Sequence, residues 1–197
     1  GQRYRSYMAD DEELALSWLR ENLPPNARLI SDPHSTHLFS ELTNSVDLLE
    51  HAMTTTEMSG VGQRQVTEIK EAVFLAKDSQ AAHRALRALA QHELSFRNRD
   101  SAQKIGRASD PTLFVLLSGK TSQWIARPGI DALYDPVLEA IDPAHLAPLT
   151  DLRYFRLRYQ VNRHLLVFEA RHLDPPQADT ALYWVAQGND RWFEGLE

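Results

Sequence analysis

The stretch "DDEELALSWLRENLPPNARLIS", residues 10–31, decides the fold class of this chain. Its first half begins with four acidic residues, which favour the positive start of a helix, and continues with apolar residues at helical spacing: Leu14, Leu16, Trp18 and Leu19. Pro24-Pro25 ends this helix, and 27–31 has the composition of a short buried strand. A helix, a tight proline turn and a strand indicate the start of a layered α/β fold.

The rest of the first half predicts further helices around one short strand. Residues 46–49 are a candidate strand, while 66–76 carries apolar residues on one helical face. A second helix starts at 78–79 and continues to about residue 89. Phe96 is a candidate for a weak strand, and 97–110 has no clear period, so we interpret that segment as a loop.

The second half is dominated by strand patterns. Residues 112–118 form a continuous apolar run typical of a central strand, and a turn at 118–121 leads into a predicted strand at 123–126. Alternation of apolar and polar residues over 155–161 predicts a half-buried strand, which turns back as a hairpin into 165–170. Residues 181–186 offer one more strand.

Together these patterns predict one layered α/β domain over residues 1–197, with a central mixed sheet and covering helices. Its first half would be Rossmann-like and its second half rich in hairpins, with a helix-rich part at 10–110 and a strand-rich part at 111–186. A short helix near 136–141 is limited by surrounding prolines.

Composition excludes several classes of function. The apolar fraction of 43% and charged fraction of 24% are those of a folded globular protein, and a net charge of −6 gives no reason to expect nucleic acid as a partner. Without cysteine there is no disulfide, thiolate nucleophile or cysteine metal site. No segment approaches the roughly 18 consecutive apolar residues of a membrane span. Because the chain starts at Gly1 without a methionine or signal peptide, we interpret it as a fragment of a longer protein.

The segment that follows the first strand, "LISDPHSTHLF" at residues 29–39, holds the candidate binding residues. Asp32, His34 and His37 are ligand types for Zn²⁺ or Fe²⁺, and a position after a strand would place them at the carboxyl edge of a sheet. Their spacing matches no recognised zinc motif. The simpler interpretation is that Asp32 caps the turn, Ser35 or Thr36 caps a following helix, and the histidines are exposed.

Other motifs carry less chemistry. The sequence Ser-Gly-Lys-Thr at 118–121 resembles the end of a phosphate-binding loop, but the required earlier glycine is replaced by Phe114, so we expect a turn with a solvated Lys120. The carboxylates of Glu12 and Glu13 are explained by the helix dipole without any catalytic role. The Thr-, Ser- and Gly-rich segment 53–62 is interpreted as a surface loop.

Two passages resemble a known class of proteins. The sequence "SWLRENLPPNARLISDP", residues 17–33, is similar to the passage that opens the soluble extracytoplasmic domain of many polytopic bacterial membrane proteins, which resemble the C-type glycosyltransferases that use polyprenyl-phosphate sugars. The sequence "YFRLRYQVNRHLLVFE", residues 154–169, resembles their terminal hairpin. The catalytic acid of those enzymes is expected between membrane spans outside this chain, so the resemblance implies no catalytic residue here and no cofactor.

The resemblance also implies a cell-membrane location, with this domain on the periplasmic side. Its partner would be the membrane-embedded part of the same polypeptide, and its ligand a saccharide or lipid-linked sugar. Three hypotheses therefore stand: a noncatalytic extracytoplasmic domain, a small metal-dependent hydrolase that uses Asp32, His34 and His37, and a sensor or solute-binding module whose loop at 54–62 closes on a ligand.

Overall fold

The structure is a computed structural model that describes residues 8–32, 35, 46–47, 68, 70–100, 111–127 and 138–172. Its helices are α2 (Asp10–Asn22), α6 (Ser79–Asp100), α7 (Gly119–Ala126) and the 3-10 helix η1 (Pro143–Leu149). Its strands are β1 (Ala27–Ile30), β2 (Val46–Asp47), β3 (Thr112–Ser118), β4 (Phe155–Val161) and β5 (Leu165–Ala170). Residues 70–74 are also helical.

The strands form one mixed sheet in the order β2-β1-β3-β5-β4. β1 lies parallel to β2 and to β3, whereas β5 is antiparallel to β3 and to β4. The turn of the β4–β5 hairpin contains Asn162 at a positive φ of 50°, a conformation that asparagine tolerates better than most residues. The predicted α/β class, the mixed sheet and the hairpin of 155–161 with 165–170 are therefore confirmed.

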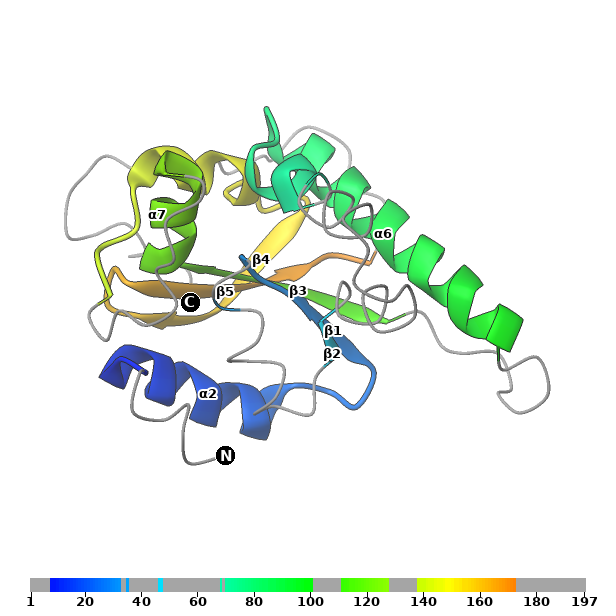
Figure 1. Cartoon of the computed structure of the whole chain (residues 1–197), viewed down its shortest axis with the longest axis horizontal. Coiled ribbons are helices and arrows are strands. Elements are labelled where there is room, and N and C mark those ends of the chain that lie inside the picture. The colour runs from blue at the N-terminus through cyan, green and yellow to red at the C-terminus, as the bar shows by residue number, and fades with distance from the viewer. Residues whose placement is uncertain are drawn as a thin grey trace.

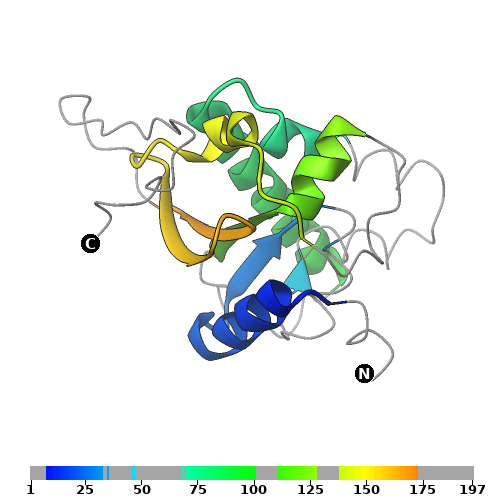
Figure 2. The ribbon, with the colours of Figure 1, turned by 90° about the vertical axis from the view of Figure 1, so that its left-hand side faces the viewer.

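Helices cover both faces of the sheet. Figures 1 and 2 show α2 on one face and α6 and α7 on the other. The side chains of β3 alternate between the two cores: Leu113, Val115 and Leu117 pack on the α6 side, while Phe114 and Leu116 pack on the α2 side. Because both faces are buried, β3 is a continuous apolar run, as the sequence indicated.

Strand β4 differs from the expected half-buried strand because it contains a bulge. Its register with β5 shifts between Leu157 and Tyr159, so Arg158 is an extra residue. Before the bulge, Phe155 and Leu157 pack in the core on the α6 side. After it, Tyr159 and Val161 pack in the core on the α2 side. One evenly alternating segment thus contributes to two opposite cores, because the extra residue reverses the direction of the side chains.

The predicted strand at 123–126 is wrong, because these residues belong to helix α7. The helix starts directly after β3 through a reciprocal cap at Ser118 and Thr121. The Ser118 N–H donates to Thr121 Oγ1 at 2.9 Å, and the Thr121 N–H donates to Ser118 Oγ at 3.4 Å. These bonds satisfy backbone donors that a helix start leaves unpaired, so residues 118–121 begin a helix and do not form a turn between strands.

Two further expectations are corrected. Helix α6 continues to Asp100, so Phe96 is not in a strand and 97–100 is not a loop. Residues 138–141 are not helical, and the 3-10 helix that follows begins at Pro143, where Asp142 Oδ1 accepts a hydrogen bond from the Ala144 N–H at 2.9 Å. The expected helix near 38–42, the loop at 53–62 and the strand at 181–186 lie outside the described residues, and the single-domain organisation over 1–197 stays a prediction.

Replacing Gly119 by alanine is expected to lower the free energy of unfolding by about 1–3 kcal/mol. A Cβ at this position would overlap the backbone carbonyl oxygen of Glu139, so the start of α7 would have to move. Chemical denaturation of the purified variant measures the loss. The control is Ala126→Ser at the exposed end of the same helix, which should change stability little. Equal stability of Gly119→Ala and the unchanged protein would contradict the close approach of Glu139.

Candidate functional site

The sheet has a topological switch point at the carboxyl ends of β1 and β3. The chain passes from β1 to β2 on one side and returns to β3 on the other side, with all three strands parallel. In open α/β sheets, ligands bind outside the carboxyl ends of the strands at such a point. Here the residues after β1 include Asp32, and those after β3 include Lys120 and Thr121.

Asp32 is fully buried at this switch point, with 0% of its surface exposed. Its Oδ1 accepts a hydrogen bond from the Ser35 N–H at 3.0 Å, and its Oδ2 accepts one from the Thr121 hydroxyl at 2.8 Å. The prediction that Asp32 caps the turn is confirmed. Ser35 is itself helical, so the capping residue is Asp32 and not Ser35. Thr36 lies outside the described residues.

His34 and His37 also lie outside the described residues. Within the described ranges, no group of three or more His, Asp or Glu side chains could hold a metal ion. The metal hypothesis for Asp32, His34 and His37 therefore stays a prediction.

Lys120 and Glu12 form a buried ion pair beside Asp32, with exposed fractions of 1% and 0%. Lys120 Nζ lies 2.8 Å from Glu12 Oε1 and 3.0 Å from Oε2, which also accepts the Ala9 N–H at 2.9 Å. The expectation of a solvated Lys120 is wrong, because α7 directs this side chain beneath the start of α2. The helix dipole alone also does not account for Glu12, because its carboxylate links α2 to α7 through the ion pair with Lys120.

Burial raises the pKa of the Glu12 carboxyl above its ordinary value, because the charged form loses its hydration. The charge and hydrogen bond of Lys120 oppose this effect, and the nearby negative charge of Asp32 adds to it. Carboxylates and an ammonium are groups that general acid–base catalysis uses. Here, however, the three side chains are buried and already engaged. Lys120 of α7 binds Glu12 of α2, and Thr121 of α7 binds Asp32 after β1, so these contacts join α2, β1 and α7.

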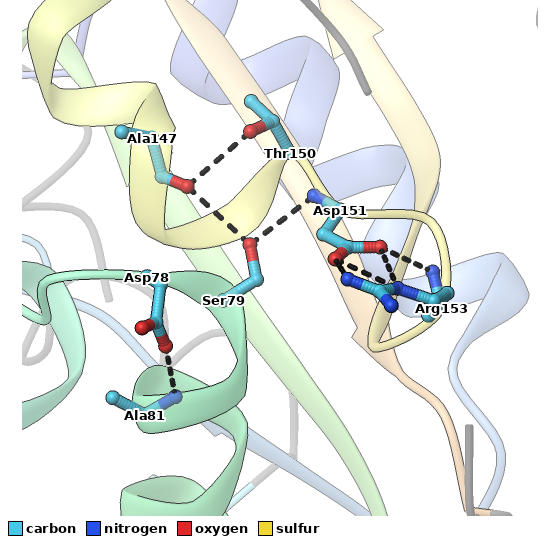
Figure 3. A network of polar contacts seen from close by, with 7 residues as sticks. All are labelled: Asp78, Ser79, Ala81, Ala147, Thr150, Asp151 and Arg153. Carbon is cyan, nitrogen blue, oxygen red and sulfur yellow. Dashed lines mark hydrogen bonds and ion pairs between the residues drawn. The ribbon is translucent and has the colours of Figure 1, made fainter. Parts of the chain in front are cut away.

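A second region is open to solvent. A cavity of about 310 Å³ lies between the start of α6 and the segment that joins η1 to β4. It is lined by residues 77–80 and, from the other segment, by Ala147, Thr150, Asp151, Arg153 and Tyr154. Figure 3 shows how Asp78, Ser79, Thr150, Asp151 and Arg153 meet there. We call this region the α6–β4 pocket.

Ser79 joins the two walls of the α6–β4 pocket. Its hydroxyl donates to the Ala147 carbonyl oxygen at 3.3 Å and accepts the Asp151 N–H at 3.1 Å (Figure 3). Thr150 Oγ1 donates to the same carbonyl oxygen at 3.2 Å. Ser79 is only 4% exposed, so its bonds lie at the floor of the pocket and hold the two walls together there.

Asp151 and Arg153 form a rigid pair on one wall. Arg153 donates from Nε to Oδ1 and Oδ2 of Asp151 at 3.1 and 3.0 Å, and from Nη2 to Oδ2 at 2.6 Å. Partial burial by itself would raise the pKa of the Asp151 carboxyl, but the hydrogen bonds and charge of Arg153 together hold it below its ordinary value. Asp151 is therefore charged at neutral pH. The guanidinium lies 5.6 Å from the ring centre of Tyr154.

His83 packs against Tyr154, a residue that lines the pocket, with 5.5 Å between the two ring centres. Its Nε2–H donates to the Arg171 carbonyl oxygen at 2.7 Å. Burial lowers the pKa of the His83 imidazole below its ordinary value of 6.5; the bond to Arg171 opposes this effect and the charge of Arg87 adds to it. The folded protein therefore holds His83 in its neutral form.

We expect the free energy of unfolding to decrease as the pH falls below 6.5, the ordinary pKa of a histidine. The unfolded chain takes up a proton on His83 more readily than the folded chain, so stability is full above that pH and is lost as the pH falls toward the lowered pKa of the folded state. Denaturation curves over this range should show a smaller decrease for His83→Gln than for the unchanged protein. His172→Gln is the matched control, and equal slopes in all three proteins would contradict the assignment to His83.

Comparison with protein-family models, with curated proteins and with solved structures gave no match to this chain. In the part of the chain that the structure describes, no helix combines the length and the apolar character needed to cross a membrane. What the chain does must therefore be argued from its own residues.

Sequence reasoning found Asp32 but missed its partners. Thr121, Lys120 and Glu12 come from two other elements, and only the Ser118–Thr121 cap gives a local signal, because a hydroxyl residue at each end of such a tetrapeptide can start a helix. The pair of Asp151 and Arg153 gave no motif at all. The predicted helix start at 78–79 is confirmed, and Asp78 caps it there: its Oδ1 accepts the Ala81 N–H at 2.8 Å.

Proposed function

We propose that this chain is a noncatalytic domain on the extracytoplasmic side of a bacterial membrane protein that resembles the C-type glycosyltransferases. It has a ligand-binding, partner-binding or structural role and needs no cofactor. On this proposal its parallel half, β2-β1-β3, is Rossmann-like, its second half is built on the β4–β5 hairpin, and its partner is the membrane-embedded part of the same polypeptide.

The observation that carries this proposal is the engagement of Asp32. Both of its carboxylate oxygens accept hydrogen bonds from within the fold, and the side chain is covered from solvent. Asp32, a candidate binding residue in the sequence, thus has a structural role. Other residues of the passage that carries the resemblance have similar tasks: Trp18 stacks on Tyr159 with 4.8 Å between ring centres, and Leu19 is 0% exposed.

The role of a sensor or solute-binding module is favoured by a separate observation, the α6–β4 pocket with its polar walls. A metal-dependent hydrolase is supported less well, because Asp32 is 0% exposed and each of its carboxylate oxygens already accepts a hydrogen bond from within the fold. Metal analysis of the dialysed protein tests the hydrolase: zinc or iron held in equal amount to the protein, and lost in both His34→Ala and His37→Ala, would favour it.

The location is tested in the full-length parent protein with topology reporters. Alkaline phosphatase fused within this domain should be active and green fluorescent protein fused at the same points should be dark, because the domain would be exported. The opposite pattern would contradict the extracytoplasmic location. The purified chain should also show no turnover of polyprenyl-phosphate sugars or of model esters. Ser122 Oγ and His145 Nδ1 lie 3.0 Å apart, but no carboxylate of a described residue bonds the His145 ring, so a complete set of nucleophile, base and orienting residue is not formed there. Reproducible turnover that disappears in His37→Ala would overturn the noncatalytic role.

A further inference from the structure

The α6–β4 pocket is separate from the switch point and shares no residue with the network around Asp32. Its volume of about 310 Å³ lies at the lower end of the range for small-molecule sites, roughly 300–1,000 Å³, and suits a ligand of about one ring. Two segments far apart in the sequence form it, and Ser79 fixes them to each other. The pocket is therefore preformed.

The walls of the pocket offer unused hydrogen-bonding groups of both kinds. Within the described residues, no hydrogen bond involves the Lys77 ammonium, the Gln80 side-chain amide or the Tyr154 hydroxyl. The Thr150 hydroxyl donates to Ala147 and keeps its oxygen free to accept. Asp78 uses Oδ1 to cap α6, which leaves its Oδ2 as an acceptor. The lining therefore offers both donors and acceptors to a ligand.

The charges of the pocket balance. Lys77 and Arg153 carry two positive charges, and Asp78 and Asp151 carry two negative charges, so the net charge of the lining is zero. Arg153 is already committed to Asp151 through three contacts, so it is a poor centre for a phosphate or a carboxylate. A lining without net charge gives no overall preference for an anion over a cation.

Lys77 and Asp78, at the rim of the pocket, are spaced to bind one hydroxyl group between them. Lys77 Nζ lies 4.0 Å from Asp78 Oδ2, which is too long for a hydrogen bond. A single hydroxyl placed between them can accept from the ammonium and donate to the carboxylate at the same time. A fully ionised phosphate monoester, which only accepts, and an ammonium, which only donates, cannot satisfy both partners.

From the balanced charge, the mixed donors and acceptors and the size of the cavity, we propose that the α6–β4 pocket binds a neutral polyhydroxylated ligand, namely one unit of a saccharide. Lys77, Asp78 and Gln80 bind its hydroxyl groups, and Thr150 contributes from the opposite wall. This inference deepens the ligand-binding role of the proposed function and rests on it for the kind of ligand, since the resemblance already implies a saccharide, whereas the position of the site follows from the pocket itself.

Titration of the 197-residue chain with methyl glycosides of glucose, galactose, mannose and N-acetylglucosamine, followed by ¹H–¹⁵N correlation spectra, tests the site. At least one glycoside should shift the backbone amides of residues 77–80 and 150–154 in a saturable way. The Lys77→Ala/Gln80→Ala double variant should bind that glycoside at least about tenfold more weakly, because it loses two hydrogen-bonding side chains. Both side chains are exposed, so the fold should be retained.

Gln160→Ala is the matched control, since it removes an exposed glutamine outside the pocket and should leave binding unchanged. Inorganic phosphate and glucose 1-phosphate are the charged probes and should bind no more tightly than the neutral glycosides. The proposal is wrong if no glycoside moves these amides, if the double variant binds as well as the unchanged chain, or if inorganic phosphate alone occupies the pocket. None of these results would alter the topology test, so the two proposals can fail separately.

Discussion

Replacing Lys120 by methionine is expected to lower the free energy of unfolding by about 3–5 kcal/mol, the usual cost when one partner of a buried ion pair is removed. Lys120 and Glu12 are 1% and 0% exposed, so water cannot replace the lost ammonium beside the carboxylate. Urea denaturation monitored by the fluorescence of the buried Trp124 and half-buried Trp18 would measure the loss.

The pH dependence of this loss follows from Glu12. Burial raises the pKa of its carboxyl above 4.5, and removal of Lys120 raises it further, because the opposing charge disappears. A carboxyl with a raised pKa destabilises the fold as the pH rises from its unfolded value through its folded value. The deficit of Lys120→Met relative to the unchanged protein should therefore be larger at pH 7 than at pH 5.

Two further variants separate the ion pair from simple truncation. Lys77→Met changes an 85% exposed lysine and should have almost no effect on stability. The double variant Glu12→Met/Lys120→Met should be less destabilised than the sum of the two single variants, because neither charge is left unpaired. Additive losses, or a Lys120→Met protein as stable as Lys77→Met, would show that the two side chains do not interact as the structure places them.

The elements that could be predicted are those with a strong local period. The helix at 10–22, the buried strand at 112–118 and the hairpin at 155–170 each carry a pattern typical of the element that forms there. The bulge at Arg158 could not be predicted, because the even alternation of 155–161 is compatible with a flat strand. The bulge lets β4 supply apolar side chains to the cores on both faces of the sheet.

The candidate site was less predictable because its contacts are long-range. Glu12 and Lys120 are 108 residues apart, and Asp32 and Thr121 are 89 residues apart. Once residues 118–121 are interpreted as a turn and 123–126 as a strand, Lys120 falls in an exposed turn, and the buried pair cannot be inferred. One mistake in secondary structure thus hid the whole network, whereas Asp32 was found because its capping role is local.

Closure of the switch point also bears on function. In many α/β proteins the carboxyl ends of the central strands leave a crevice for a ligand. Here that position is filled by two bonded pairs, Asp32 with Thr121 and Lys120 with Glu12. The polar pocket lies elsewhere, at the start of α6. A binding role at the α6–β4 pocket and a structural role at the switch point are therefore compatible in one small fold.

Replacing Asp32 by alanine is expected to lower the free energy of unfolding by about 2–4 kcal/mol, because two buried donors, the Ser35 N–H and the Thr121 hydroxyl, lose their acceptor. Asp32→Asn should cost less, about 1 kcal/mol, since its amide oxygen can still accept one of these bonds. Denaturation curves of the two variants measure the difference. A cap alone would cost only about 0.5–2 kcal/mol, so the larger loss reflects the added bond from α7.

The histidines of the same segment distinguish this junction from a metal site. If Asp32 acts only within the fold, His34→Ala and His37→Ala should each change stability by no more than about 0.5 kcal/mol, and a chelator should change nothing. A metal site requires the reverse, because bound metal adds its binding free energy to folding: both histidine variants would lose stability, and a chelator would reproduce that loss in the unchanged protein. Thr121→Val provides the decisive comparison. It removes the hydroxyl that donates to Asp32 and that also accepts the Ser118 N–H, so it should lower stability in the junction and leave any metal content unaltered.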